Sequence, residues 1–424
     1  MGSHVTTDRA LWSAQAHMPT VLGQQIEIVG GDGSYVTTSS GQRLLDATAG
    51  LWHANIGHGR EELARAAYDQ MRRLETYHVF GRFVNDSALV LADRLAAYAP
   101  FADAKVILTS GGSDSVDNAC KLARRHWQLE GRTSKKIILS REYAYHGLHA
   151  YGTSIAGLQY NREGYGAESL IPETGLIDSS DISRVEDEVL RLGPNNIAAI
   201  VVELIMGTGG VIPPVPGYLE GLQRLAAEHD ILLIADEVIT GFGRTGTMFA
   251  CGRYAFTPDL LLMAKGITSG YAPLGGVLVT PRLWKRFYEG SDAPLYRHGT
   301  TYSGHATACA VALANLDIIE GEGLIGRAGE FETVLDRALE PARSHELVAD
   351  VRVGGLLGGV ELAQSVDGTA VVDFALTEGV ILRLLRGHTL QISPPFIITE
   401  DEINTIVEVI LAGIQAQTKM TVAV

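Results

Sequence analysis

Two short apolar runs between residues 231 and 265 each end at a charged side chain. Residues 231–235 lead directly into Asp236, and residues 260–264 lead into Lys265 and a glycine-bearing turn. Short continuous apolar runs bounded by turn signals are typical of strands that are buried on both faces of a sheet. The stretch therefore predicts two buried strands, one ending at an acid and the next ending at an amine.

Strand-like and helical patterns alternate through the middle of the chain, whereas longer helices follow from about His305 onward. Such alternation indicates an α/β fold with a mostly parallel sheet covered by helices. The predicted strands are 105–109, 136–139, 197–205, 231–235, 260–264 and 276–280. The clearest predicted helices are 61–71, 87–98, 116–127, 218–229, 331–342 and 403–414.

The length of 424 residues suggests more than one domain. We expect an N-terminal arm and part of a small domain over residues 1–60, and a large domain over residues 61–305. Residues 306–424 would complete the small α/β domain, so that both ends of the chain contribute to it.

Composition excludes several classes of function. The chain has 34 basic and 49 acidic residues, a net charge of −15, which argues against a nucleic-acid partner. Its apolar stretches are shorter than the roughly 18 to 20 residues of a spanning helix, so we expect no membrane segment. The three cysteines show no metal-binding or disulfide spacing, so we expect no metal and a cytoplasmic location.

Lys265 and Asp236 suggest a specific chemistry. A partly desolvated lysine has a lowered pKa and can form an imine, although most lysines at strand ends are simply exposed. A carboxylate after five apolar residues is costly to bury unpaired, so Asp236 is either a turn cap or the partner of a buried cation. Pyridoxal phosphate needs both an imine-forming lysine and an acid that keeps its pyridine nitrogen protonated. If the chain stays extended beyond Asp236, Val238 points to the same side and could pack on the ring.

A glycine-rich turn, Ser110-Gly111-Gly112-Ser113, separates a predicted strand from a predicted helix. Two glycines allow close backbone approach, and the free N–H groups of a helix start attract an anion such as a phosphate. The Ser113 hydroxyl adds a donor. An ordinary N-cap turn explains the same residues equally well.

Two further residues lie where strands are predicted to end. Tyr145 follows the strand at 136–139 and could stack on a planar cofactor, although a tyrosine of the core or of a loop is the simpler reading. Glu203 is an acid within the last part of the strand at 197–205. Ligands of open parallel sheets bind beyond the carboxyl ends of the strands, so these residues should converge with Asp236 and Lys265.

The chain resembles the class III (ω-amino-acid type) aminotransferases, which are pyridoxal-phosphate enzymes of the aspartate aminotransferase fold (fold type I). The segments that carry the resemblance read LIADEVITGFGRTG over residues 233–246 and AKGITSGYAPLGG over residues 264–276. The likeness extends from about Leu45 to Pro395. It implies a large cofactor-binding domain, a smaller domain built from both chain ends, and an active homodimer.

The resemblance also implies roles for individual residues. Lys265 would hold pyridoxal phosphate as an imine and move the substrate proton, and Asp236 would pair with the pyridine nitrogen. Thr301 would reach the phosphate bound by the neighbouring subunit. The remaining implied cofactor contacts are Gly111, Gly112 and Ser113 at the phosphate, Val238 below the ring, Tyr145 above it and Glu203 nearby, and the implied substrate contacts are Trp52, Tyr77 and Phe80.

Two departures from the family pattern lie near the expected site. Leu204 stands where the family usually has a proline after its glutamate, so the loop after Glu203 could take a different path. Thr300 replaces an aromatic residue that often precedes the phosphate threonine, which could widen the substrate pocket.

A third departure concerns an arginine that many relatives place about ten residues before the Pro-Pro of the C-terminal region. Counting back from Pro394, that position is Leu384, flanked by Arg383 and Arg386. In an extended segment Arg386 shares a face with residue 384, whereas Arg383 does not. This favours Arg386 for binding a substrate carboxylate through a bidentate pair, with a surface arginine as the alternative.

We therefore expect transamination between an amine or ω-amino acid donor and a keto acid or aldehyde acceptor, in a ping-pong reaction. An aminomutase or a decarboxylase of dialkylated amino acids shares the same motifs and stays as the alternative. A non-enzymatic binding module predicts loss of Lys265 or Asp236, and both are present. The identity of the substrate pair stays open.

Overall fold

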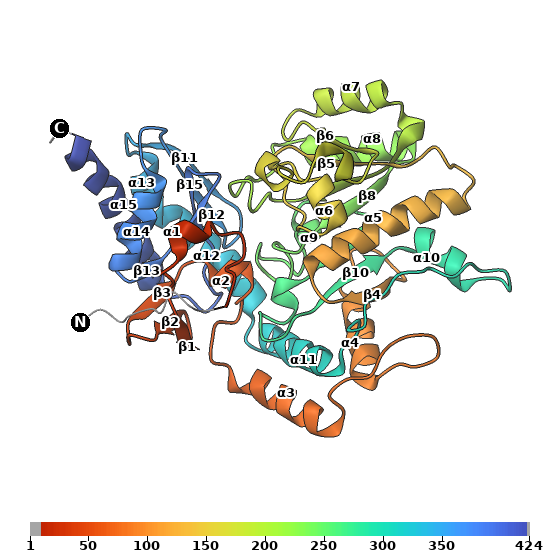
Figure 1. Cartoon of the computed structure of the whole chain (residues 1–424), viewed down its shortest axis with the longest axis horizontal. Helices are drawn as coiled ribbons and strands as arrows, with labels where there is room; N and C mark the ends of the chain where they lie inside the picture. The colour runs from red at the N-terminus through yellow and green to blue at the C-terminus, as the bar shows by residue number, and fades with distance from the viewer. Residues whose placement is uncertain (1–9, 422–424) are drawn as a thin grey trace.

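The computed structural model describes residues 10–421 and divides into two parts (Figure 1). The larger part surrounds a central sheet, and the smaller part contains the first described strands together with the last helices. Residues 1–9 and 422–424, which belong to the two terminal regions predicted from the sequence, lie outside the described residues.

The central sheet is mostly parallel, as predicted. Within the described residues it has seven strands in the order β4-β10-β9-β8-β7-β5-β6, and only β10 runs antiparallel to its neighbours. Six of the strands agree with predicted ones to within two residues at each end, whereas β6 lies outside the predictions. The strands are β4 (Lys105–Thr109), β5 (Ile137–Arg141), β6 (Thr174–Ile177), β7 (Ile197–Glu203), β8 (Leu232–Asp236), β9 (Leu260–Met263) and β10 (Gly275–Val279).

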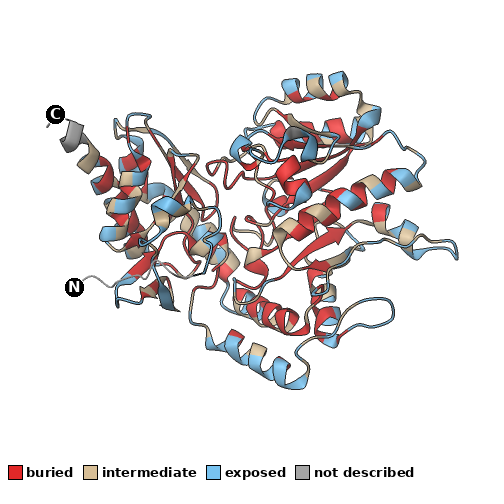
Figure 2. Ribbon diagram, in the orientation of Figure 1, coloured by how far each residue is buried: buried red, intermediate tan, exposed pale blue. Residues whose placement is uncertain are grey.

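The middle strands are apolar throughout because both faces of the sheet are covered. Every residue of β7, β8, β9 and β10 is buried (Figure 2). Successive side chains of a strand point to opposite faces. In β8, Leu232 and Ile234 accordingly pack in one core cluster with α5, whereas Leu233 and Ala235 pack in another with α8.

The predicted helices are present, with one difference. The helix expected over 331–342 is two helices, of which α12 begins earlier and α13 begins with a proline in its first turn, where proline is tolerated. Helices that match the prediction are α3 (Glu61–Arg73), α4 (Asp86–Ala97), α5 (Gly112–Leu129), α8 (Tyr218–His229) and α15 (Glu400–Thr421); the divided pair is α12 (Leu324–Ala338) and α13 (Glu340–Arg343). The others are α1 (Met18–Val21), α2 (Ala49–Trp52), α6 (Ala150–Ser154), α7 (Ile182–Leu192), α9 (Ala250–Arg253), α10 (Pro281–Tyr288), α11 (Ala306–Gly321) and α14 (Gly368–Thr377).

The smaller part joins the two ends of the chain. One of its sheets has the order β1-β2-β3-β13, in which the late strand β13 pairs in parallel with the early strand β3. The other is antiparallel, with the order β11-β12-β15-β14. Their bounds are β1 (Ile28–Asp32), β2 (Tyr35–Thr38), β3 (Arg43–Asp46), β11 (Val348–Val353), β12 (Gly358–Leu362), β13 (Val380–Ile381), β14 (Arg383–Leu385) and β15 (Thr389–Ile392).

The division at residues 60/61 and 305/306 stays a prediction. It assigns α11 to the C-terminal domain, whereas this helix packs against α3 and α4 of the larger part. Across residues 10–421, none of the helices is both long and apolar enough to cross a membrane.

Candidate active site

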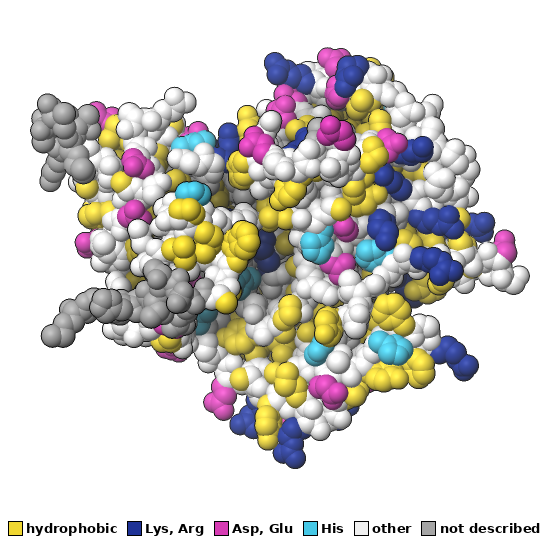
Figure 3. All heavy atoms as spheres, in the orientation of Figure 1, with side chains coloured by type: hydrophobic (Ala, Val, Ile, Leu, Met, Phe, Trp, Pro, Cys, Tyr) yellow, Lys and Arg dark blue, Asp and Glu magenta, His cyan; other side chains and the backbone are white. Residues whose placement is uncertain are grey.

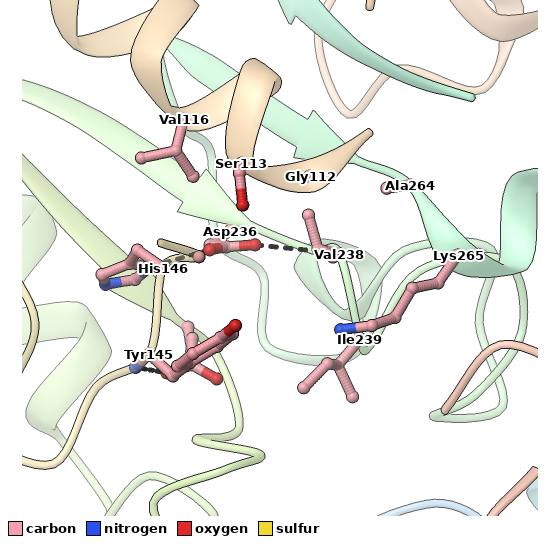
Figure 4. Close-up of a pocket in the computed structure, with 12 residues that line it drawn as sticks. Gly112, Ser113, Val116, Tyr145, His146, Asp236, Val238, Ile239, Ala264 and Lys265 are labelled. Atoms are coloured by element: carbon pink, nitrogen blue, oxygen red, sulfur yellow. Dashed lines mark hydrogen bonds and ion pairs between the residues drawn. The ribbon is translucent and has the colours of Figure 1, made fainter. Parts of the chain in front are cut away.

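A pocket of about 190 Å³ lies at the carboxyl ends of β7, β8 and β9 (Figure 4). The register of the sheet pairs Glu203 with Asp236, which brings these two strand-end acids to adjacent positions. Lys265 follows β9 by two residues, and Tyr145 comes from the loop after β5. All four side chains line the pocket, so the convergence expected of a parallel sheet is found.

The Lys265 side chain reaches into the pocket toward Ile239 and Tyr145 (Figure 4). Its backbone is left-handed, with φ 48°, and its Nζ atom lies 5.4 Å from the centre of the Trp52 ring. Among the described residues, none forms a hydrogen bond or ion pair with this amine. Burial lowers the pKa of Lys265 to about 8, opposed by the negative charges of Asp236 and Glu203. A neutral, unencumbered amine can act as a nucleophile.

Asp236 lies on the opposite wall and is held at both carboxylate oxygens. One oxygen is 2.7 Å from His146 Nδ1, and the other accepts a hydrogen bond of 3.1 Å from the Val238 N–H. The carboxylate is thereby oriented before any ligand binds.

The condition that the chain stay extended beyond Asp236 is not met. The hydrogen bond from the Val238 N–H to the Asp236 side chain closes a turn directly after β8. Val238 nevertheless lines the pocket, and it lies so close to α5 that a Cβ on Gly112 would meet Val238 Cγ1 at 3.0 Å. The valine therefore reaches the pocket through a turn rather than through strand alternation.

The glycine-rich turn opens α5 at the same pocket. Helix α5 begins at Gly112, and the first N–H groups of a helix have no partner within it. Gly147 presses against this turn with φ 81°, and a Cβ there would lie 2.2 Å from Ser113 Oγ. Because only glycine permits this approach, the backbone after His146 and the start of an 18-residue helix form one cradle suited to an anion.

Glu203 braces two loops of the site. Its carboxylate accepts hydrogen bonds from the Tyr145 N–H at 3.0 Å and from the Gly207 N–H at 2.9 Å. Burial raises its pKa. Leu204, where the family pattern has proline, is fully buried beside it. The glutamate thus positions the Tyr145 loop as well as lining the pocket.

The residues expected to bind substrate fall into two groups. Trp52 is buried near Lys265, whereas Tyr77 and Phe80 are 45% and 46% exposed and lie elsewhere. The Phe80 ring is near Gly299, beside Thr300 and the exposed Thr301. Thr300 does reach the start of the glycine-rich turn, where its hydroxyl is 3.0 Å from Ser110 Oγ.

The strand-alternation argument that favoured Arg386 over Arg383 does not hold, and a role for Arg386 in binding a carboxylate stays a prediction. Strand β14 ends at Leu385, and left-handed backbone at Arg386 (φ 52°) and Gly387 (φ 78°) turns the chain, so strand alternation does not apply. The Arg383 guanidinium instead lies 4.8 Å from the centre of the Trp52 ring. Its positive charge lowers the pKa of Lys265, although less than burial does.

Reasoning from sequence missed two buried residues. His146 holds Asp236, and its only signal was its place next to Tyr145. Arg244 lies in the glycine-rich turn of residues 241–246 and donates hydrogen bonds to the Pro394 carbonyl at 2.6 Å and to Asn55 Oδ1 at 2.8 Å. These contacts fasten the turn after Asp236 to the smaller part of the molecule.

The pocket fits pyridoxal phosphate. It offers an amine for the aldehyde, a fixed carboxylate for the pyridine nitrogen, a helix start for the phosphate and a valine beneath a planar ring. Each of these groups comes from a different element, and all of them line one cavity.

Comparison with known proteins agrees with this geometry. The family model of class III aminotransferases matches residues 19–414. The putrescine–pyruvate aminotransferase of Pseudomonas aeruginosa is 34% identical, over 89% of this chain and 87% of that protein. The omega-amino acid–pyruvate aminotransferase of Pseudomonas putida is 33% identical, over 87% of each chain.

Solved structures lead to the same family. A transaminase from the marine bacterium Virgibacillus superposes with a TM-score of 0.92 and 34% identity, covering 98% of each chain. An amine transaminase from an uncultivated Pseudomonas species, described in its PLP-bound form, gives a TM-score of 0.91 with 34% identity over 96% of this chain and 99% of that one. The chain therefore belongs to the class III aminotransferases and is a pyridoxal-phosphate-dependent transaminase of fold type I.

Proposed function

We propose that the enzyme transfers an amino group from a primary amine or ω-amino acid to a keto acid or aldehyde in two half-reactions. The observation that carries the proposal is the placement of Lys265 and Asp236 on opposite walls of one pocket that also holds the start of α5. The relatives named for putrescine or ω-amino acids with pyruvate support the same substrate classes. Bound pyridoxal phosphate supplies an aldehyde and an electron-withdrawing ring.

The chain supplies the binding and the proton transfer. Lys265 Nζ would hold the cofactor aldehyde, and its free amine would accept the proton from the substrate carbon and return it. A lowered pKa suits this exchange because the amine can take up and release a proton near neutral pH. The Asp236 carboxylate would accept a hydrogen bond from the protonated pyridine nitrogen, and its hydrogen bond with His146 keeps the carboxylate in place. Ser113 and the first N–H groups of α5 would hold the phosphate.

Arg383 is the residue that we propose for the carboxylate of a short keto acid such as pyruvate. Its guanidinium and Lys265 Nζ both lie over the Trp52 ring, at 4.8 and 5.4 Å from its centre. A carboxylate bound there sits beside the reacting amine, and a bidentate pair orients it. Trp52 itself is 3% exposed and shields this region from water.

A single-turnover experiment tests the reaction. The cofactor-loaded enzyme is mixed with an amine and no acceptor, and the products are measured. Stoichiometric formation of pyridoxamine phosphate with a carbonyl product supports transamination. Release of carbon dioxide, or a rearranged amine with no carbonyl product, would identify one of the alternative reactions.

We also propose that the active unit is a homodimer. Large exposed apolar side chains gather along residues 77–84 and the adjoining residues 299–304, a patch typical of an interface. Thr301 is exposed on this surface, which suits a residue that serves the partner's phosphate site.

Mixing two inactive variants tests the dimer. A hybrid of Lys265→Ala and Thr301→Glu chains contains one site with both native residues, so mixing should restore up to a quarter of the activity if Thr301 acts across the interface. Inactive mixtures would show that it does not.

A cytoplasmic location is proposed as well, supported by three free, buried thiols at Cys120, Cys251 and Cys309.

A further inference from the structure

A second and larger pocket, of about 800 Å³, is lined in part by Glu142 and Tyr143, which precede Tyr145 of the catalytic pocket in the same loop. Tyr143, from the loop after β5, and Tyr160 form its aromatic walls, Leu176 of β6 lines its side, and Arg386 enters from the turn after β14. The pocket thus lies between the larger and the smaller part. Figure 3 shows basic side chains in the hollow between these two parts.

Arg386 has no acidic partner within the described residues. Its guanidinium lies 4.0 Å from the centre of the Tyr143 ring and donates a hydrogen bond of 3.3 Å to the Gly209 carbonyl. No carboxylate of residues 10–421 forms an ion pair with it. Both members of the stacked pair have left-handed backbone, φ 67° at Tyr143 and φ 52° at Arg386. Such conformations are costly for residues other than glycine and collect at functional sites.

Tyr160 connects this pocket with the catalytic one. Burial raises the pKa of its hydroxyl, and the positive charges of Arg383 and Arg386 both act on it in the opposite direction. Tyr160 therefore lies within electrostatic reach of Arg386 in this pocket and of Tyr145 in the catalytic pocket. Arg383 and Arg386 are three positions apart, with two residues of β14 between them, so roughly 10 Å separates their backbone positions.

We propose that the second pocket is an outer subsite of the active site, in which Arg386 binds the terminal carboxylate of long-chain amino acids whose amine reacts at Lys265. This inference rests on the proposed transamination. Short keto acids would use Arg383, and only a chain long enough to pass Tyr160 would reach Arg386.

The lining of the pocket favours this ligand over other anions. The rings of Tyr143 and Tyr160 and the side chain of Leu176 offer apolar surface for methylene groups. The free guanidinium edge suits a carboxylate through charge-assisted hydrogen bonds. The acidic Glu142 also lines the pocket, so a doubly charged phosphate is repelled more strongly than a single carboxylate.

Matched pairs of amines test the subsite in the cofactor-loaded enzyme with pyruvate as acceptor. The readout is the ratio of kcat/KM for 8-aminooctanoate to that for octylamine, which isolates the carboxylate. Arg386→Met should lower this ratio by about tenfold to a hundredfold, the range expected for a charge-assisted pair. Glu142→Gln, in the same pocket, should raise it. The corresponding ratio for 3-aminopropanoate and propylamine should change far less in both variants.

The outer subsite is overturned if Arg386→Met leaves the long-chain ratio unchanged, or lowers the long-chain and short-chain ratios equally. Wild-type activity with octylamine separates these results from a failure of the proposed function, since an enzyme without transaminase activity would turn over neither amine. Calorimetric binding of octanoate, which needs no turnover, gives a second measurement. Its Kd should rise at least tenfold in folded Arg386→Met, and an equal Kd contradicts the proposal.

Discussion

Two buried lysines lie at opposite ends of the parallel strands of the central sheet, and the groups that surround them differ. Lys135 precedes β5, at the amino ends of the parallel strands, and Lys265 follows β9, at their carboxyl ends. Burial lowers the pKa of each to about 8. Lys135 Nζ donates to four backbone carbonyls, those of Pro194 (3.3 Å), Ile197 (3.0 Å), His229 (3.2 Å) and Asp230 (2.7 Å).

The difference shows that burial alone does not make a lysine reactive. The Lys135 ammonium satisfies carbonyls of two separate segments, residues 194–197 and 229–230, and is held in place by them, so it acts as a structural cation. Lys265 has no such acceptors within the described residues. Its amine lies over the face of Trp52 and is attracted by the negative charges of nearby acids. Its lone pair is free for a carbonyl carbon once the proton leaves. The surroundings of Lys265, at the carboxyl ends of the strands, therefore differ from those of Lys135, at the amino ends, in that no described residue accepts a hydrogen bond from the lysine.

The largest expected effect is on Lys265. Lys265→Ala should lower turnover by roughly 10⁴-fold or more, because it removes both the covalent hold and the proton acceptor. Its thermal stability without cofactor should stay close to that of the wild type, since the amine has no hydrogen bonds to lose. Steady-state kinetics and thermal unfolding measure the two quantities. Normal turnover in this variant would refute the catalytic assignment.

Lys135→Ala should show the reverse behaviour. Removing the amine leaves buried carbonyls without a donor, and we expect the free energy of unfolding to fall by about 3 kcal/mol. Activity per cofactor-loaded subunit should remain. Denaturant unfolding combined with cofactor absorbance checks both expectations. The adjacent Lys136, which is exposed, provides the matched control, and Lys136→Ala should change neither quantity.

His146 lies at the carboxyl ends of the strands, where its ring forms a hydrogen bond with the Asp236 carboxylate. His146→Phe should weaken cofactor binding by about tenfold, because Asp236 loses one of its two hydrogen bonds. Equilibrium titration of the cofactor-free enzyme measures this change. His146→Asn, which can still donate to Asp236, should recover part of the affinity. Equal losses in both variants would mean that ring packing rather than the hydrogen bond matters.

Local sequence patterns predicted those features of the site that the ends of strands and the starts of helices position. The ends of β8 and β9 follow from apolar runs, and the meeting of Asp236 with Lys265 follows from parallel strands that share an edge. Turns were harder, because the Asx-type hydrogen bond at Val238 and the left-handed Arg386 depend on contacts rather than on periodicity.

Lys135 illustrates the same limit at longer range. In the sequence it stands beside Lys136 in a polar stretch and looks like a surface residue. Its four acceptors come from segments about 60 and 95 positions away, brought together only when the sheet forms. No local pattern could have separated the buried lysine from its exposed neighbour.

A further effect of the two buried lysines is expected in the pH dependence of stability. A folded lysine with a pKa of about 8 releases its proton at a pH where the unfolded lysine, near 10.5, still holds it. Stability of the cofactor-free enzyme should therefore rise with pH between about 8 and 10.5, by up to about 1.4 kcal/mol per pH unit for each such lysine. Because the two lysines share this pKa, Lys265→Met and Lys135→Met should each flatten the rise by a similar amount, as unfolding at pH 8, 9 and 10 would reveal. The carbonyl contacts thus distinguish the two lysines in absolute stability and not in the slope. A rise that either variant leaves unchanged would mean that this lysine keeps an ordinary pKa in the folded enzyme.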